Sequence, residues 1–113
     1  MKYLMLGAIT EAGQQLRGPD LEAWMAEIVA WYDKQGAAGT LADAGYQLDF
    51  PHTARTVRAR GVTDGPYMEA KEVLAGYWLL QTETIDEGVE IAKTWPGVDR
   101  DWIVMEIRPV MAQ

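Results

Sequence analysis

The sequence predicts an α+β fold in which an antiparallel sheet carries two helices on one face. Apolar stretches typical of strands alternate along the chain with two stretches that have helical spacing. Their order is strand, helix, strand with a hairpin piece, strand, helix, strand, which favours the split βαβ arrangement of a ferredoxin-like sandwich. The chain has 113 residues and shows no internal repeat or linker, so we expect a single domain over residues 1–113.

The first half of the chain is expected to hold two strands and one helix. Residues 1–9 are apolar on both alternating faces, which is typical of a strand buried on both sides. Apolar side chains recur at helical spacing over 20–35, and Gly36 is expected to cap that helix. A strand spaced by glycines follows over 39–48, and we expect it to be bulged at Gly45.

The second half of the chain predicts three strands and one helix. Residues 53–60 are rich in Thr, Val and Arg and predict a short strand, and 61–66 predict a turn region. The stretch 74–81 is the clearest strand and is again apolar on both faces. A Thr-Ile-Asp-Glu capping box opens the helix predicted over 84–94, and the last strand is expected over 102–109.

One face of the predicted sheet has no cover. Both helices pack on the same face in this fold, yet the strands over 1–9 and 74–81 are apolar on both sides, and Trp102 and Val104 add to the second face. Burying apolar surface contributes roughly 25 cal/mol per Å², so such a face is expected to find a partner. We therefore predict a homodimer that packs sheet to sheet.

The composition excludes several kinds of chemistry. The chain has no Cys, Ser or Asn, and its one histidine is His52. Serine and cysteine nucleophiles, thiolate metal sites and disulfides are therefore excluded, and one histidine with scattered carboxylates has no metal-ligand spacing. A glycine-rich phosphate loop is also missing from the sequence, so we expect neither a metal nor a cofactor. Chains without cysteine are consistent with a reducing cytoplasm, where we expect this protein.

The charge of the chain argues against nucleic-acid and membrane partners. The net charge is -7, and only the segment 51–71 is basic, with four cations against Asp64 and Glu69. An acidic protein repels phosphate backbones, so we expect no nucleic-acid binding. Apolar runs fall short of the ~20 residues that a membrane helix needs, so we expect no membrane span.

The most distinctive motif lies between Val62 and Glu72. Its sequence is Val-Thr-Asp-Gly-Pro-Tyr-Met-Glu-Ala-Lys-Glu, and Gly76-Tyr77 follows. It resembles the signature of the YCII-related, or DGPF-domain, family, which runs Asp-Gly-Pro-Phe, x-Glu-x-Lys-Glu and Gly-Tyr, with Tyr67 in place of the phenylalanine. The Thr-Val-Arg strand and the terminal Glu-x-Arg-Pro of the family are similar as well. The resemblance implies a ferredoxin-like subunit of the dimeric α/β-barrel group.

The same resemblance implies little about a reaction. Some relatives in the wider YCII group resemble small-molecule enzymes that use a His–Asp acid–base pair, with the histidine on the first helix. The helix predicted over 20–35 contains no histidine, so this pair is not carried over. Other relatives are encoded beside sigma factors, which implies a regulatory or accessory role for some members.

Three residues are candidates for direct chemistry. Asp64 begins a Gly-Pro turn, where a carboxylate usually accepts backbone N–H groups; the alternative is a general base at the mouth of a pocket. His52 is the one side chain that ordinarily titrates near neutral pH, although a loop histidine is usually only solvated. Arg58 is a candidate for binding an anionic group, and the alternative is a solvated strand face.

Tyr67, Glu69 and Lys71 complete the candidate site as substrate-binding residues, because they belong to the motif. The alternative for Glu69 and Lys71 is a solvated or ion-paired run.

Two functional hypotheses follow. The first is a dimeric enzyme without a cofactor that moves protons on a small organic acid, with Asp64 or His52 as the base and Arg58 on the anionic group. The second is a non-catalytic small-molecule-binding or regulatory accessory module that uses the same cleft. An Asp64 carboxylate that faces an aromatic-lined pocket favours the enzyme, and one that serves its own turn favours the module.

Overall fold

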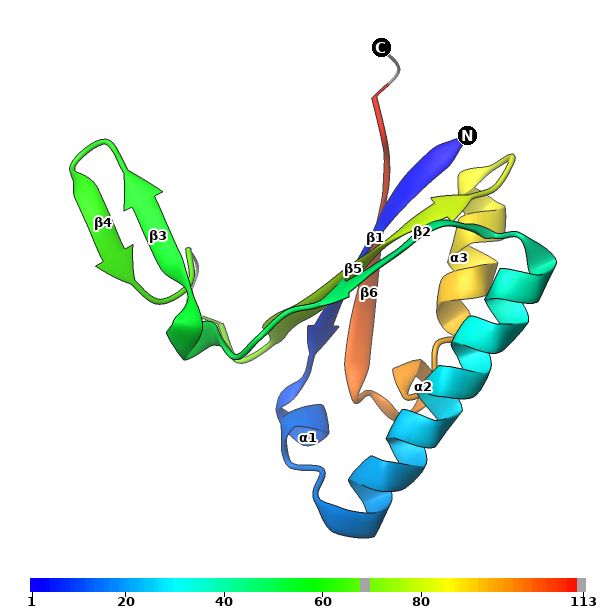
Figure 1. The fold of residues 1–113 in the computed structure, drawn as a ribbon, viewed down its shortest axis with the longest axis horizontal. Helices are drawn as coiled ribbons and strands as arrows, with labels where there is room; N and C mark the ends of the chain where they lie inside the picture. Colours follow the sequence, from blue (N-terminus) through cyan, green and yellow to red (C-terminus); the bar gives the residue numbers. More distant parts are fainter. Residues whose placement is uncertain (68–69, 112–113) are drawn as a thin grey trace.

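One four-stranded antiparallel sheet forms the centre of the structure (Figure 1). Its strands are β1 (Lys2–Ile9), β2 (Leu41–Gln47), β5 (Val73–Gln81) and β6 (Ile103–Pro109). This computed structural model describes residues 1–67 and 70–111. The strands lie in the order β2, β5, β1, β6, each antiparallel to its neighbours. A helix follows β1 and another follows β5, so the predicted α+β, ferredoxin-like fold is confirmed.

Two helices cover one face of this sheet. They are α2 (Gly18–Ala38) and α3 (Ile85–Lys93), and both lie on the same side of the strands in Figure 1. A single helical turn, α1 (Glu11–Gln14), follows β1. Within residues 1–67 and 70–111, none of the helices has the length and apolar character needed to cross a membrane.

The helix α2 ends three residues later than expected. Gly36 was expected to cap it, but Gly36 lies inside the helix and Gly39 is the cap, with a left-handed φ of 72°. The prediction was wrong because Ala37 and Ala38, which have the highest helix propensity, carry the helix past one glycine. The capping box of α3 is confirmed, since the Thr84 hydroxyl accepts the backbone N–H of Glu87 at 3.2 Å.

The core lies between the helices and the sheet and is rich in aromatic rings. Met5 of β1 and Leu80 of β5 are fully buried there. Around them pack the rings of Trp31, Trp78 and Trp95, with centroids 4.6 Å apart for Trp31 and Trp95 and 4.5 Å apart for Trp78 and Trp95. These tryptophans therefore serve the core rather than an open cavity.

The other face of the sheet is left uncovered by the two helices. On β1, Leu4, Leu6 and Ala8 point to this face and are only half-buried, whereas Tyr3 and Met5 lie under the helices. The register places Leu79 and Tyr77 of β5 beside Leu4 and Leu6. We call this surface the open face; its apolar residues are Leu4, Leu6, Ala8, Tyr46, Leu74, Tyr77, Leu79 and Val104.

A two-stranded hairpin projects from the end of the sheet, where a strand and a turn were expected. Its strands are β3 (Arg55–Arg58) and β4 (Gly61–Asp64), and a 3₁₀ turn, η1 (Pro51–Thr53), precedes them. The expectation of a turn over 61–66 is therefore wrong for its first half. Val62 and Thr63 favour extended backbone, and they pair with Val57 and Thr56. We call residues 55–64 the arm.

Candidate functional site

A hollow lies in the corner where the open face meets the root of the arm. Its volume is about 750 Å³, and most of the side chains around it are apolar. We call it the corner cavity. Sheet residues form one wall, and the segments that lead into and out of the arm form the others. Its lining is Ala8, Leu48, Asp49, Phe50, Pro51, Thr53, Ala54, Pro66, Tyr67, Ala70, Glu72, Val73 and Leu74.

Local hydrogen bonds hold the segment on the incoming side of the arm. The Asp49 carboxylate accepts the backbone N–H of Phe50 at 2.7 Å. The carbonyl of Phe50 accepts the Thr53 hydroxyl at 2.7 Å and the Thr53 backbone N–H at 3.0 Å. Pro51 supplies the restricted φ that suits the first position of this short turn. The backbone of Phe50 is thereby fixed, while the residue as a whole is 73% exposed beside the cavity.

Two bonds close the root of the arm. The backbone N–H of Gly65 donates to the carbonyl of Ala54 at 2.8 Å, and the buried hydroxyl of Thr56 donates to the carbonyl of Gly65 at 2.8 Å. Gly65 has a φ of 99°, which an L side chain rarely adopts. The Asp-Gly-Pro sequence thus turns the chain at the base of the arm and brings Pro66 and Tyr67 to the cavity wall.

The polar groups around the cavity are few. Among the described lining residues, the charged ones are Asp49 and Glu72, and both are carboxylates. The hydroxyls of Thr53 and Tyr67 are the other polar side-chain groups. Phe50 and Tyr67 offer aromatic faces, which can stack on a flat ring. The cavity therefore suits a compact ligand with an apolar ring and hydrogen-bond donors rather than a carboxylate or phosphate.

Asp64 does not line the corner cavity. Its carboxylate lies 3.2 Å from the Nε of Arg55, its cross-strand neighbour, and its side chain is 87% exposed. Among the described residues, the structure shows this carboxylate in an exposed ion pair across the arm. Such pairs contribute about 0–1 kcal/mol to stability.

His52 also lies outside the cavity lining. It sits in the 3₁₀ turn, exposed, with its imidazole stacked on Phe50 at a centroid distance of 6.1 Å and an interplanar angle of 14°. Its place in the candidate site is therefore indirect, through contact with a ring that does line the cavity.

Of the other predicted binding residues, Tyr67 belongs to the wall of the corner cavity, and Arg58 and Lys71 lie outside the lining. Tyr67 lines the cavity, and the guanidinium of Arg58 lies 5.3 Å from the centre of its ring. Lys71 is exposed, and its carbonyl accepts the side-chain amide of Gln14 at 2.8 Å. Glu69 lies outside the residues that the structure describes.

Sequence reasoning missed the residues that form most of the cavity. Phe50 and Pro51 follow the strand predicted over 39–48 and were given no functional role, and Asp49 was not considered. The signal that could have found them is the aromatic residue directly before a proline, in a segment between two strands and too polar to be core. Glu72 is the last residue of the motif, but it was given no role of its own.

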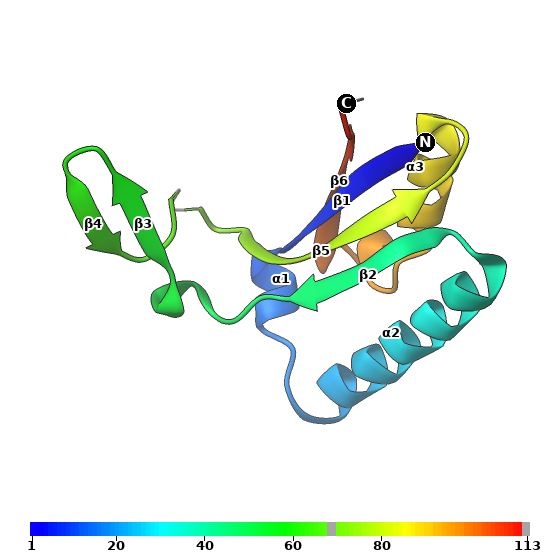
Figure 2. The ribbon, with the colours of Figure 1, turned by 45° about the horizontal axis from the view of Figure 1, so that its top comes forward.

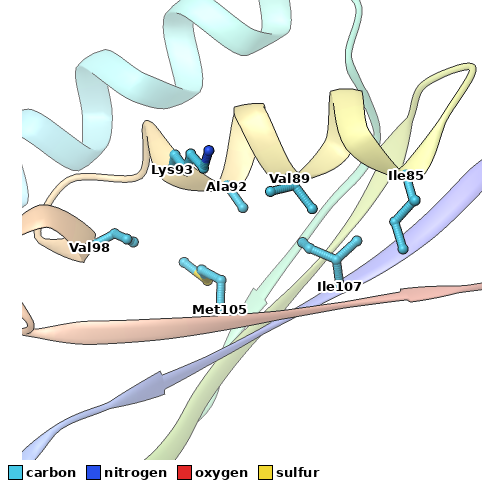
Figure 3. A pocket seen from close by; sticks show the side chains of 7 residues that line it. All are labelled: Ile85, Val89, Ala92, Lys93, Val98, Met105 and Ile107. Carbon is cyan, nitrogen blue, oxygen red and sulfur yellow. The ribbon is translucent and has the colours of Figure 1, made fainter.

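A second, smaller hollow lies on the helical side of the sheet (Figure 3). Its volume is about 270 Å³, and the side chains of α3 and β6 point toward each other across it. Apart from Lys93, its walls are aliphatic, so it is the seam between helix and sheet rather than a site for chemistry. Among residues 1–67 and 70–111, no three His, Asp or Glu side chains lie together in a way that could hold a metal ion.

Comparisons with known proteins support the fold and identify a family. The sequence model of the YCII-related domain matches residues 1–112, which confirms the resemblance seen in the motif. No curated protein sequence matches the chain. Among solved structures, 5-chloro-2-hydroxyhydroquinone dehydrochlorinase (TftG) from Burkholderia phenoliruptrix AC1100, in complex with 2,5-dihydroxybenzoquinone, is similar with a TM-score of 0.54 and 14% identity. The similarity covers 100% of this chain and 96% of that chain, and at this identity it concerns the fold alone.

Proposed function

The chain belongs to the YCII-related family, and we propose that it is a small-molecule-binding protein whose ligand occupies the corner cavity. The observation that carries the proposal is the cavity itself: about 750 Å³, with walls formed by Phe50, Tyr67 and the end of the sheet. Ligand pockets usually have about 300–1,000 Å³, mostly apolar walls and a few polar groups that fix orientation. The corner cavity has all three properties.

The ligand class we propose is a flat ring that is neutral or positively charged. Asp49 and Glu72 bring negative charge to the cavity, whereas the guanidinium of Arg58 lies over Tyr67 and is not part of the lining. An anionic ligand would meet two carboxylates without a matched cation, which is unfavourable in a partly desolvated site. The small organic acid expected from the sequence is therefore replaced by a ligand with donors for these carboxylates.

A planar ring is also the kind of ligand named for the similar structure. The dehydrochlorinase was solved with 2,5-dihydroxybenzoquinone, a six-membered ring compound. Because the likeness to that protein concerns the fold, this supports only the size and flatness of the proposed ligand. Its polarity is argued from Asp49 and Glu72 of this chain.

Acid–base chemistry is the second candidate function, and one observation favours it. Asp49 and Glu72 line the cavity, so a bound ligand would be within reach of a carboxylate that can accept a proton. The Asp49 carboxylate already accepts the N–H of Phe50, whereas no hydrogen bond from another described residue occupies the Glu72 carboxylate. We propose Glu72 for this role ahead of Asp64 and His52, whose side chains lie outside the lining. Binding without chemistry requires fewer groups and is our first candidate.

The ligand proposal is tested by calorimetric titration with benzylamine, benzyl alcohol and benzoate, which share one ring and differ in charge. We expect affinity to fall in that order, and Phe50→Ala to weaken benzylamine binding about tenfold, a loss of about 1.4 kcal/mol in line with one aromatic contact. Glu72→Gln should reduce the preference for benzylamine over benzyl alcohol.

Met25→Ala is the matched control, because Met25 is 54% exposed on α2 and outside the cavity. Its affinities should equal those of the wild type. Benzoate binding more tightly than benzylamine would contradict the ligand class, and equal affinities for Phe50→Ala and wild type would contradict the site.

We also propose that the protein works as a homodimer packed through the open face. The support is the apolar surface that the helices leave uncovered, in which Leu4, Leu6, Tyr77 and Leu79 lie side by side. At its rim, Glu106 and Arg108 pair with each other at 2.7 Å. An apolar centre with a charged rim is typical of an interface between subunits.

Leu6→Lys is expected to weaken this dimer at least tenfold, since it places an ammonium group in the middle of the interface. The subunit itself should tolerate the change, because Leu6 lies opposite Glu106 in the register and a lysine there gains an opposite charge. Sedimentation equilibrium should give twice the 12.6 kDa chain mass for the wild type at micromolar concentration. Val29→Lys, on an exposed position of α2, is the control. A wild-type mass of one chain would contradict the dimer.

A further inference from the structure

Within residues 1–67 and 70–111, the arm has no extensive packing against other helices or strands of its own subunit. The arm's extensive contacts are those between β3 and β4. Val57 and Val62 face each other across the two strands, and they are 77% and 62% exposed. A two-stranded hairpin in water is marginally stable by itself, and an exposed pair of valines adds nothing to its solubility. The arm therefore has the properties of an element that lacks its packing partner.

The dimensions of the molecule agree with this interpretation. The radius of gyration is 15.3 Å, against about 13 Å for a compact domain of this length. The molecule measures 45 × 44 × 18 Å, so it is flat, with the arm extended away from the helices (Figure 2).

The arm stands on the side of the sheet that the helices leave bare. Figure 1 shows α2 on one side of the strands and the arm on the other, and the turned view in Figure 2 agrees. The open face and the arm thus form two sides of an open angle, with the corner cavity at its vertex, where Leu74 of the sheet and Tyr67 of the arm root share the lining. A body that packs on the open face fills this angle and meets the arm.

The distribution of charge between the arm and the rest of the chain indicates what packs on the open face. The arm carries Arg55, Arg58 and Arg60 against Asp64, a net charge of +2, whereas the whole chain has a net charge of -7, which leaves -9 for the remaining residues. Arg55 is neutralised by Asp64, so Arg58 and Arg60 near the tip provide the excess. A basic arm on an acidic body is complementary to a second copy of the same chain.

We infer that the arm is a clasp between subunits: it lies against a second copy of this chain, with Val57 and Val62 buried on that copy and the tip arginines over its acidic surface. The inference rests on the homodimer proposed above and adds a second contact to it. In a two-fold dimer the clasp occurs twice, since each arm holds the other subunit. The second copy then covers the corner cavity at the vertex of the angle, so the binding site is complete only in the dimer.

The test compares self-association of the wild type, the double variant Val57→Thr/Val62→Thr and the control Val29→Thr by sedimentation velocity over a dilution series. Threonine keeps the shape and strand preference of valine and removes apolar surface. We expect the dimer dissociation constant to rise at least tenfold for the arm variant and to stay within twofold of wild type for the control. Hydrogen exchange of the wild type supplies a second readout, in which amides of residues 55–64 exchange more slowly at concentrations where the dimer forms.

The outcomes separate this inference from the proposals on which it rests. A dimer whose dissociation constant is unchanged by the arm variant, and whose arm amides exchange at a rate independent of concentration, overturns the clasp and leaves the sheet-to-sheet dimer intact. A wild-type chain that is monomeric throughout the series overturns both. The ligand titrations described above can fail without any effect on these measurements, because neither readout needs a ligand.

Discussion

Gly45→Ala is expected to lower the free energy of unfolding by on the order of 3 kcal/mol. This loss has two sources: alanine disfavours the left-handed backbone conformation, and its added methyl group overpacks the sheet. Gly45 has a φ of 65° at the bulge of β2, where the pairing with β5 shifts between Asp43 and Tyr46. A Cβ atom there would lie 1.7 Å from the carbonyl oxygen of Tyr77 and 2.7 Å from its carbonyl carbon. Both contacts are with backbone, so relief requires β2 to move away from β5.

Urea denaturation followed by tryptophan fluorescence measures this loss, because the core tryptophans lie beneath the same sheet. Gly36→Ala provides the matched control: it is the same chemical change inside α2, where an added Cβ meets no atom within 4 Å. Alanine is favoured over glycine in a helix by about 1 kcal/mol, so this variant should be more stable than the wild type. Equal effects of the two substitutions would show that the bulge carries no special constraint.

The sheet and the helices could be predicted from the sequence because their patterns are local. Residues 1–9 and 74–81 are short apolar runs bounded by polar residues, and the helical segment beginning near Pro19 has its own start signal, so each element is specified within its own residues. The bulge at Gly45 was also predictable, since glycine within a strand indicates a close approach of backbone. The end of α2 was not, because Gly36 and Gly39 are both suitable caps and the choice depends on the intervening alanines.

The arm was only half predicted because its second strand is short and lies between glycines. Val62 and Thr63 are the only strand-forming residues between Gly61 and Gly65, too few for a period of two to be recognised. Because of this error, Asp64 was expected at the start of a turn, whereas it is the last residue of β4. Its pairing with Arg55 follows from the hairpin register, which a sequence pattern does not give when the hairpin itself is missed.

The motif lies beside the corner cavity that we propose as the ligand site. Asp-Gly-Pro shapes the root of the arm, and among the predicted chemical and binding residues that the structure describes, only Tyr67 lines the cavity. The cavity exists because the segment 48–54 and the segment after Gly65 meet the end of β5, residues far apart along the chain. Such convergence depends on the tertiary fold, so the aromatic residue before Pro51 indicates a loop but does not by itself indicate a cavity, and Asp49 has no signal of its own.

Trp78→Ala is expected to destabilise the protein by about 3–5 kcal/mol, the usual cost of removing a large buried aromatic side chain. Trp78 is 5% exposed, packs on the ring of Trp95, and lies so close over Gly7 that a Cβ there would be 2.8 Å from its ring. The cavity left behind would be bounded by backbone on the side of Gly7, which cannot fill it. Because a domain of this size has a total stability of about 5–15 kcal/mol, the variant should unfold at much lower urea concentration.

Trp78→Phe distinguishes the contribution of the indole's volume to stability from that of its hydrogen bond to the hydroxyl of Tyr32. It keeps an aromatic ring in the core and removes the N–H donor, so its expected cost is smaller, about 1.5–3 kcal/mol. Burial raises the pKa of the Tyr32 hydroxyl, and the hydrogen bond from Trp78 lowers it. Loss of the donor should therefore raise the pKa of Tyr32 further, which alkaline absorbance titration measures. A pKa that is unchanged in Trp78→Phe would mean that the indole contributes through packing alone, and the whole loss in Trp78→Ala would then be assigned to the cavity.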